Sequence, residues 1–348
     1  MNTKVYIVDA RHPNTDLLVS AAHIIQEGGL VAFPTETVYG LGADGTDSEA
    51  VAKIFMAKGR PSDNPLILHI ADTAMVKTLA KEVPANARIL MGRFWPGPLT
   101  LVLKRTQAVP DVVTGGLDTV AIRLPDSEVA RELIRLAGVP VAGPSANTSG
   151  RPSPTTAQAV LADLEGKIEG IIDAGPCGIG VESTVVDCTT PVPTLLRPGG
   201  ITMEMLLEVL GEVEYQPIKG EDTKAPRAPG MKYKHYAPLA PMVLYEGDSA
   251  QVAKAIADAS KIALESKRVG AIVSNETAAL LEKGVQVADY GSRYRPEEVA
   301  AGLYEALRYF DSEPVDVIYA EGIDEFGLGL AVMNRLRKAA GYRIVKVE

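Results

Sequence analysis

The sequence predicts an α/β protein of two domains joined by a short linker. The chain has 348 residues, and a typical domain has roughly 150. Hydrophobic residues make up 46% of the chain, which is enough for two packed cores. Short β-branched runs alternate with amphipathic stretches on both sides of a basic, proline-rich segment, a pattern typical of α/β proteins. We therefore place the domains at 1–216 and 241–348 and the linker at 217–240.

The first domain combines strands with helices, which favours an α/β or α+β arrangement. Strands are predicted at Val5–Val8, Leu30–Phe33, Leu66–Ile70, Leu99–Leu103, Val120–Leu124, Ile171–Ile172 and Thr184–Val186. Helices are predicted at 17–28, 46–58 and 126–138. The second of these helices begins with a capping box formed by Thr46 and Glu49, and Asp126 and Ser127 can cap the third.

The second domain alternates strictly between strand and helix patterns. Strands are predicted at 242–245, 269–274, near 285 and at 315–320, and helices at 249–266, 276–283, 296–310 and 330–340. This alternation predicts a small, mostly parallel, doubly wound sheet. Between the domains, residues 217–236 carry five basic and two acidic side chains and several prolines. Such a composition is typical of a solvated tether.

Composition excludes several classes of protein. Two cysteines are too few for a disulfide framework, and four scattered histidines lack metal-ligand spacing. The formal net charge of -9 argues against a protein that coats nucleic acid through bulk charge. The amino terminus shows no signal-peptide pattern, and no apolar stretch is long enough to span a bilayer. We expect a cytoplasmic protein without a membrane segment.

Two motifs resemble known site signatures without matching them. Gly40-Leu-Gly42-Ala-Asp-Gly45 fits a dinucleotide fingerprint, but six residues separate it from the preceding strand, where the fingerprint needs a tight turn. Gly143-Pro-Ser145-Ala-Asn147 resembles a nucleophile elbow, but Asn147 replaces the last glycine and no paired histidine is evident. A polar loop that hydrogen-bonds a ligand fits the second motif better.

A cationic loop is the first candidate site. Lys58, Arg60 and Asn64 lie in a loop restrained by glycine and proline, between a predicted helix and a predicted strand. Arginine can bind two phosphate oxygens at once and lysine adds a point charge, so the loop suits a polyphosphate. An exposed basic loop without a ligand is the alternative.

Buried cations supply the rest of the candidate site. Arg123 lies inside the apolar run Val120–Leu124, and a guanidinium there needs an anionic partner. That partner is either a structural carboxylate from elsewhere in the chain or the carboxylate of a substrate. His69 and Arg197 pose similar questions in their own apolar runs. The hydroxyl and amide groups around them come from Ser145, Asn147, Ser149 and Ser153. Together these side chains predict a site for two anions, one polyphosphate and one carboxylate.

Five motifs in order now resemble one family. They are Pro34-Thr-Glu-Thr-Val-Tyr-Gly-Leu-Gly42, Lys58-Gly-Arg-Pro61, Trp95-Pro-Gly-Pro-Leu-Thr100, Pro144-Ser-Ala-Asn147 and Pro229-Gly-Met-Lys-Tyr-Lys-His-Tyr-Ala-Pro238. The first four are similar to the YrdC family of threonylcarbamoyl-AMP synthases, and the last is similar to the linker of its long, two-domain form. The resemblance implies a twisted, open α/β sheet in the first domain and a Rossmann-like second domain.

The same resemblance implies a reaction. L-threonine, bicarbonate or carbon dioxide, and ATP would give threonylcarbamoyl-AMP and pyrophosphate, with Mg²⁺ carried mainly by ATP and no metal ligand from protein side chains. A separate transferase complex would then pass the threonylcarbamoyl group to an adenosine in tRNA, and a weak contact of this chain with tRNA is compatible with that role. Rival interpretations are an RNA-binding module without chemistry and a nucleotide-linked oxidoreductase.

Site residues follow from the resemblance. Threonine would contact Thr37, His69, Arg123 and Ser183. ATP would contact Lys58, Arg60, Asn64, Thr119, Ser145, Asn147, Ser153, Arg197 and Tyr236, with Lys58 and Arg60 in the catalytic role. Gly143 departs from the family pattern, in which many relatives have a larger or hydroxyl-bearing residue, so this position offers no side-chain contact to threonine. No dedicated base for the threonine amine is evident: His69, solvent and the carbamate itself stay open. Because Tyr236 would contact ATP, the resemblance favours a linker that covers the site as a lid over one that is a passive tether.

Overall fold

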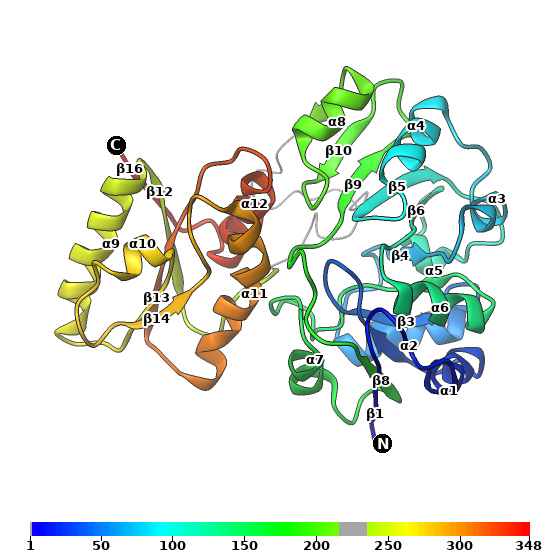
Figure 1. Ribbon diagram of the computed structural model, residues 1–348, viewed down its shortest axis with the longest axis horizontal. Coiled ribbons are helices and arrows are strands. Elements are labelled where there is room, and N and C mark those ends of the chain that lie inside the picture. The colour runs from blue at the N-terminus through cyan, green and yellow to red at the C-terminus, as the bar shows by residue number, and fades with distance from the viewer. Residues whose placement is uncertain (1, 216–234) are drawn as a thin grey trace. The chain divides into compact units, whose positions relative to one another are not determined.

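The computed structural model describes residues 2–215 and 235–348, so most of the predicted linker 217–240 lies outside the described residues. The chain divides into two compact units (Figure 1). The described part of unit 1 comprises 2–149, 153–178 and 182–215, and unit 2 comprises 150–152, 179–181 and 235–348. Two short segments within the sequence range of the predicted first domain therefore belong to the second unit.

Unit 1 contains an 11-stranded mixed sheet with the order β1-β8-β2-β3-β7-β4-β6-β5-β9-β10-β11. Its strands are β1 Lys4–Ile7, β2 Val31–Phe33, β3 Gly40–Asp44, β4 Ile67–His69, β5 Leu99–Lys104, β6 Thr119–Arg123, β7 Val141–Ala142, β8 Gly170–Asp173, β9 Thr184–Asp187, β10 Thr194–Arg197 and β11 Glu214–Tyr215. Its helices are α1 Thr15–Gln26, α2 Ser48–Lys58, α3 Val76–Leu79, α4 Ala85–Phe94, α5 Asp111–Thr114, α6 Glu128–Ala137, α7 Ala157–Leu164 and α8 Met203–Leu210, with a 3-10 turn at Thr73–Met75.

Local sequence explains where the helices that frame the site begin and end. The side chain of Asp47 accepts a hydrogen bond from the Glu49 amide, so Asp47 caps α2 and the predicted capping box at Thr46 was wrong. Gly59 ends α2 in the left-handed region at φ 60°, which turns the chain directly into the cationic loop. Ser127 caps α6 as predicted, and α6 packs on α1 over a shared apolar core (Figure 1).

Unit 2 contains a five-stranded sheet in the order β14-β13-β15-β12-β16, and each pair in it is parallel. Its strands are β12 Met242–Gly247, β13 Val269–Val273, β14 Gln286–Asp289, β15 Val317–Glu321 and β16 Ile344–Val347. Its helices are α9 Ser249–Leu264, α10 Asn275–Ala278, α11 Pro296–Ser312 and α12 Gly329–Ala339. The predicted parallel α/β class is confirmed, but the helix predicted at 276–283 is the single turn α10, and β16 was not predicted.

Candidate active site

Strand register brings His69, Arg123 and Arg197 into one row of the sheet. His69 on β4 is paired with Arg123 on β6, and Arg123 is paired with Thr100 on β5. Thr100 is paired in turn with Val185 on β9, and Val185 with Arg197 on β10. Paired residues of neighbouring strands project from the same face of a sheet. Side chains from positions far apart in the sequence therefore lie on one face of unit 1.

Arg123 is buried, with 3% of its surface exposed, and it has two kinds of partner. Its Nη1 donates to the Thr37 hydroxyl at 2.9 Å, and its Nε donates to the Gly97 carbonyl at 3.3 Å. Its Nη2 lies 2.8 Å from the Glu36 carboxylate. The structural acid left open by the sequence therefore exists. Glu36 is not among the predicted site residues, although it directly precedes Thr37 in the first family motif.

Thr37 is held in place by its neighbour Thr35. The Thr35 hydroxyl donates to the Val38 carbonyl at 2.7 Å and lies 2.8 Å from the Thr37 hydroxyl. Since Thr35 has a single hydroxyl proton, Thr37 is the donor between the two threonines. The Thr37 oxygen then accepts from Arg123, so the whole chain of hydrogen bonds has one direction.

His69 is an uncharged histidine beside a guanidinium. Its side chain is 3% exposed, and its ring meets the Phe33 ring edge-on at 5.6 Å between centroids. Burial, and then the charge of Arg123, lower the pKa of His69 to about 3. A neutral imidazole at physiological pH can accept or donate a hydrogen bond to a substrate hydroxyl, but with this pKa it is a weak base for a substrate amine.

Ser183 links the middle of the row to its Arg197 end. Its hydroxyl lies 2.8 Å from that of Thr100, and Arg197 donates to its carbonyl at 3.0 Å and to its hydroxyl at 3.1 Å. Arg197 is only 6% exposed. The structure thus brings Thr37, His69, Arg123 and Ser183 together, with Arg197 next to them.

A second cluster lies around the end of α2. The buried Lys58 ammonium donates to the backbone carbonyls of Ser145 and Asn147. The Ser145 hydroxyl donates to the Asn147 side chain at 2.6 Å. These contacts fold the Pro-Ser-Ala-Asn loop around the lysine. The Ser145 hydroxyl donates to the Asn147 amide oxygen and not to a histidine, which argues against a nucleophile role.

Arg60 and Asn64 belong to the same cluster. Arg60 donates to the Pro65 carbonyl at 3.1 Å, which folds the cationic loop back on itself. Asn64 is 1% exposed, yet its side-chain oxygen finds no hydrogen-bond partner among the described residues. A buried amide oxygen with no donor suits a ligand that carries one.

Thr119 lies at the opposite end of β6 from Arg123. Both residues are two positions from Ala121, and alternate residues of a strand project from the same face, so Thr119 and Arg123 share a face. Four residue steps at about 3.3 Å put the two ends roughly 13 Å apart. Ser153 is buried and donates to Glu182 at 2.5 Å, next to Ser183.

Tyr236 belongs to unit 2. Its backbone is in the left-handed region at φ 64°, and 4% of its surface is exposed. Its ring lies 5.4 Å from that of Tyr304, with the Arg335 guanidinium 5.9 Å from its centre. These contacts do not test its assignment to ATP, which stays a prediction.

The glycine motif at 40–45 forms strand β3 and no phosphate loop. A Cβ atom on Gly42 would lie 3.0 Å from the Phe33 ring, so the glycine makes room for that aromatic side chain. Among the described residues, no group of three or more histidine, cysteine or acidic side chains could hold a metal ion. Nor does any helix in that part of the chain have the length and apolar character needed to cross a bilayer.

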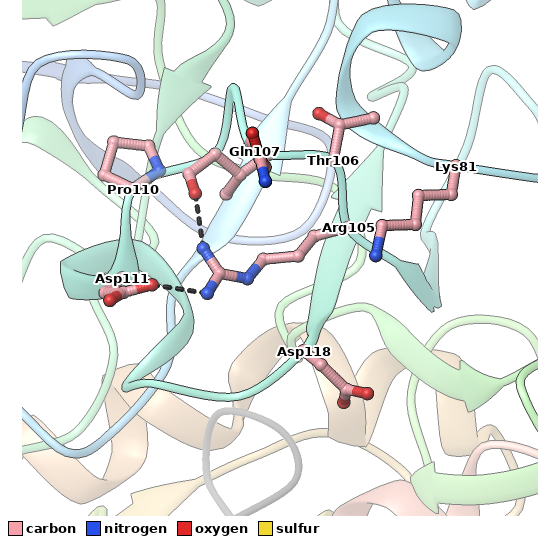
Figure 2. A pocket seen from close by; sticks show the side chains of 8 residues that line it. Lys81, Arg105, Thr106, Gln107, Pro110, Asp111 and Asp118 are labelled. Atoms are coloured by element: carbon pink, nitrogen blue, oxygen red, sulfur yellow. Dashed lines mark hydrogen bonds and ion pairs between the residues drawn. The ribbon is translucent and has the colours of Figure 1, made fainter.

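A pocket of about 390 Å³ lies in unit 1 between the end of β5 and α5. Figure 2 shows Arg105 reaching across it to Asp111 and to the Val109 carbonyl, which it contacts at 2.6 Å. Lys81 and Asp118 line the same pocket. Arg105 and Asp111 form an ion pair within the pocket, and no predicted site residue lines it.

Comparison with known proteins identifies the family. A family model described as "Telomere recombination" matches residues 23–199, and one described as "Threonylcarbamoyl-AMP synthase, C-terminal domain" matches residues 201–341. The chain belongs to the threonylcarbamoyl-AMP synthase family. The curated threonylcarbamoyl-AMP synthase of Pyrococcus abyssi is 54% identical over 94% of this chain and 95% of its own length. That of Bacillus subtilis is 49% identical over 99% of this chain and 100% of its own length.

Solved structures agree with the family assignment. The crystal structure of P. abyssi Sua5 complexed with L-threonine is 52% identical, and it covers 99% of this chain and 100% of its own with a TM-score of 0.94. The two-domain form and fold class predicted from the sequence are thereby confirmed. As a threonylcarbamoyl-AMP synthase, the chain is an enzyme of the nucleotidyltransferase type that serves tRNA modification.

Proposed function

We propose that one face of unit 1 makes threonylcarbamoyl-AMP from L-threonine, bicarbonate and ATP. The observation that supports this is the arrangement along β6: Arg123 with Thr37 and His69 at one end, and Thr119 at the other, the end at which the parallel strand β4 begins after the Lys58 loop. An amino acid at the first end and a triphosphate at the second would lie in line. The carbamate formed on the threonine nitrogen would then approach the α-phosphorus.

The threonine end supplies binding and orientation. Arg123 pairs with the substrate carboxylate, and Thr37, His69 and Ser183 contact the hydroxyl and position the amine. The low pKa of His69, about 3, disfavours it as the proton acceptor. We therefore assign deprotonation of the amine to solvent or to the carbamate itself, two of the alternatives that the sequence left open.

The ATP end supplies charge stabilisation. Negative charge grows on the phosphoryl oxygens and the departing pyrophosphate, and fixed cations in a partly buried site stabilise it. Carbonyl oxygens hold Lys58 in position, and Ser183 holds Arg197. Arg60, Asn64, Ser145, Asn147 and Ser153 complete the nucleotide contacts. As the family resemblance implies, we assign Mg²⁺ mainly to ATP itself.

Partners and compartment complete the proposal. The product would pass in the cytoplasm to a tRNA threonylcarbamoyl transferase complex, which forms N6-threonylcarbamoyladenosine. Tyr236 and the linker would cover the adenylate as a lid. A weak contact with tRNA also belongs to this proposal.

Pyrophosphate release tests the proposed function. With ATP present, release is expected to require both L-threonine and bicarbonate, and the adenylate should be detectable by mass spectrometry. An RNA-binding module without chemistry would release none, and an oxidoreductase would bind nicotinamide nucleotides. For the lid, Tyr236→Ala is expected to lower the adenylate recovered for each ATP consumed. Unchanged recovery would leave a passive tether.

A further inference from the structure

Glu36 carries a carboxylate whose capacity to accept hydrogen bonds is unused. Its side chain is 14% exposed, and both of its oxygens are buried and accept no hydrogen bond from the described residues. A carboxylate has about four lone-pair sites, and leaving them empty in a buried place costs free energy. Such a carboxylate is typical of a site that awaits a donor.

The contact with Arg123 does not fill that capacity. Arg123 Nη2 lies 2.8 Å from Glu36 Oε1, yet neither atom makes a hydrogen bond, because their alignment is poor. Arg123 instead directs Nη1 at Thr37 and Nε at Gly97. Glu36 and Arg123 are therefore an ion pair held by charge, and each keeps one polar edge available for another group.

An α-amino acid has the matching pattern of charge. Its ammonium and carboxylate are attached to the same carbon, so a carboxylate bound to Arg123 puts the ammonium within a few ångströms of Glu36. The other titratable neighbour of Arg123 in the register row, His69, is uncharged and does not compete for the ammonium. Cys177 also lies near Glu36, and burial raises the pKa of its thiol to about 12, so it too is neutral.

We propose that Glu36 binds the ammonium group of the amino-acid substrate. The Glu36–Arg123 ion pair is then a template for a zwitterion: the incoming carboxylate takes the guanidinium, and the ammonium takes the carboxylate. Three N–H donors satisfy oxygens that otherwise accept none. Glu36 thereby selects amino acids over hydroxy acids. The inference rests on the proposed assignment of Arg123 to the substrate carboxylate.

Three ligands distinguish the contact of Glu36 with the ammonium from the contact of Arg123 with the carboxylate. L-Threonine has both charges, (R)-3-hydroxybutyrate lacks the ammonium, and L-threoninol lacks the carboxylate. Dissociation constants are measured by calorimetry on the full-length protein and on Glu36→Gln, Glu36→Asp and Arg123→Met variants. Glu82→Gln is the matched control, because Glu82 pairs with Lys104 on the surface. Thermal unfolding of each variant shows whether it is folded.

The wild-type protein is expected to prefer L-threonine to (R)-3-hydroxybutyrate by roughly ten- to hundredfold, as for a hydrogen bond between charged groups. In Glu36→Gln that preference should fall to about threefold or less, while Glu36→Asp keeps part of it. A preference that survives in Glu36→Gln would overturn the role of Glu36. A purely structural role would weaken both ligands equally, which also keeps the preference.

The Arg123→Met variant tests the premise separately. It is expected to abolish the preference for L-threonine over L-threoninol while keeping any preference for an ammonium. If L-threonine binds Arg123→Met as well as it binds the wild-type protein, the assignment of the pocket fails, whatever Glu36 does. If the Arg123 result is as expected and the Glu36 result is not, the proposed function stands and the inference about Glu36 fails.

Discussion

Gly143 lies so close to His69 that a Cβ atom at position 143 would be 3.0 Å from the imidazole Nδ1 and 3.2 Å from Cε1. The same Cβ would be 3.2 Å from the Phe33 ring. Many relatives were expected to have a larger residue here, and the structure gives the physical reason for glycine in this chain. The buried imidazole occupies the space that a side chain would need.

We therefore predict that Gly143→Ala weakens threonine binding. The added methyl group must displace His69 or Phe33, both of which are buried, and overpacking of this kind costs about 1–3 kcal/mol. Because His69 faces the proposed threonine site, the KM for threonine should rise while the KM for ATP changes little. Gly92→Ala is the control, since a Cβ there meets nothing within 4 Å. Equal kinetics for the two variants would show that the space around His69 is not limiting.

The second prediction concerns pH and the stability of unit 1. The folded-state pKa of His69 is about 3, below the ordinary value of 6.5, so between these values an unfolded chain binds a proton that the folded chain does not. Stability should therefore fall as the pH falls below about 6.5, with a slope of up to about 1.4 kcal/mol for each pH unit from this residue.

Urea unfolding at pH 7 and at pH 5.5 measures this slope. The wild-type protein and His69→Asn are compared, and His23→Asn is the control because His23 is exposed. The loss of stability between the two pH values should be smaller in His69→Asn than in the other two proteins. Equal losses in all three proteins would mean that His69 is protonated in the folded state as readily as in the unfolded state.

The sequence alone predicts those features of the site that depend only on neighbouring residues in the chain. The loop from Lys58 to Asn64 and the requirement of Arg123 for an anion both follow from a few neighbouring residues. The partner of Arg123 did not follow, because Glu36 lies between β2 and β3 and reaches β6 only once the sheet is assembled. Likewise, β3 is rich in glycine and β7 has two residues, so neither has the β-branched run that identifies a strand.

The third prediction concerns Lys58. Its ammonium donates to the backbone carbonyls of Ser145 and Asn147, which hold it in position. If its charge stabilises the transition state, Lys58→Met should lower the rate of pyrophosphate release on the order of a hundredfold, and Arg60→Met should act similarly.

Lys53→Met is a matched control, because Lys53 lies on the same helix and also donates to a carbonyl, that of Gly28 at 2.6 Å. Rates within about threefold of the wild-type value in the Lys58 and Arg60 variants would contradict their catalytic assignment.

The fourth prediction concerns unit 2, where Glu321 ends β15 with 0% of its surface exposed. One of its oxygens accepts from the Ser274 amide at 2.7 Å and from the Ser274 hydroxyl at 2.9 Å, and the other lies 3.1 Å from Arg293. Glu321→Ala would leave the Arg293 guanidinium, itself 10% exposed, without that carboxylate, and breaking a buried pair in this way costs about 3–5 kcal/mol. Glu313→Ala, an exposed position beside α11, should cost little by comparison. Differential scanning calorimetry should show a lower unfolding temperature for Glu321→Ala, with unchanged threonine affinity.

An unchanged unfolding temperature would mean that this ion pair contributes nothing to the stability of unit 2. A loss of threonine affinity in a folded variant would show that unit 2 acts on the site in unit 1.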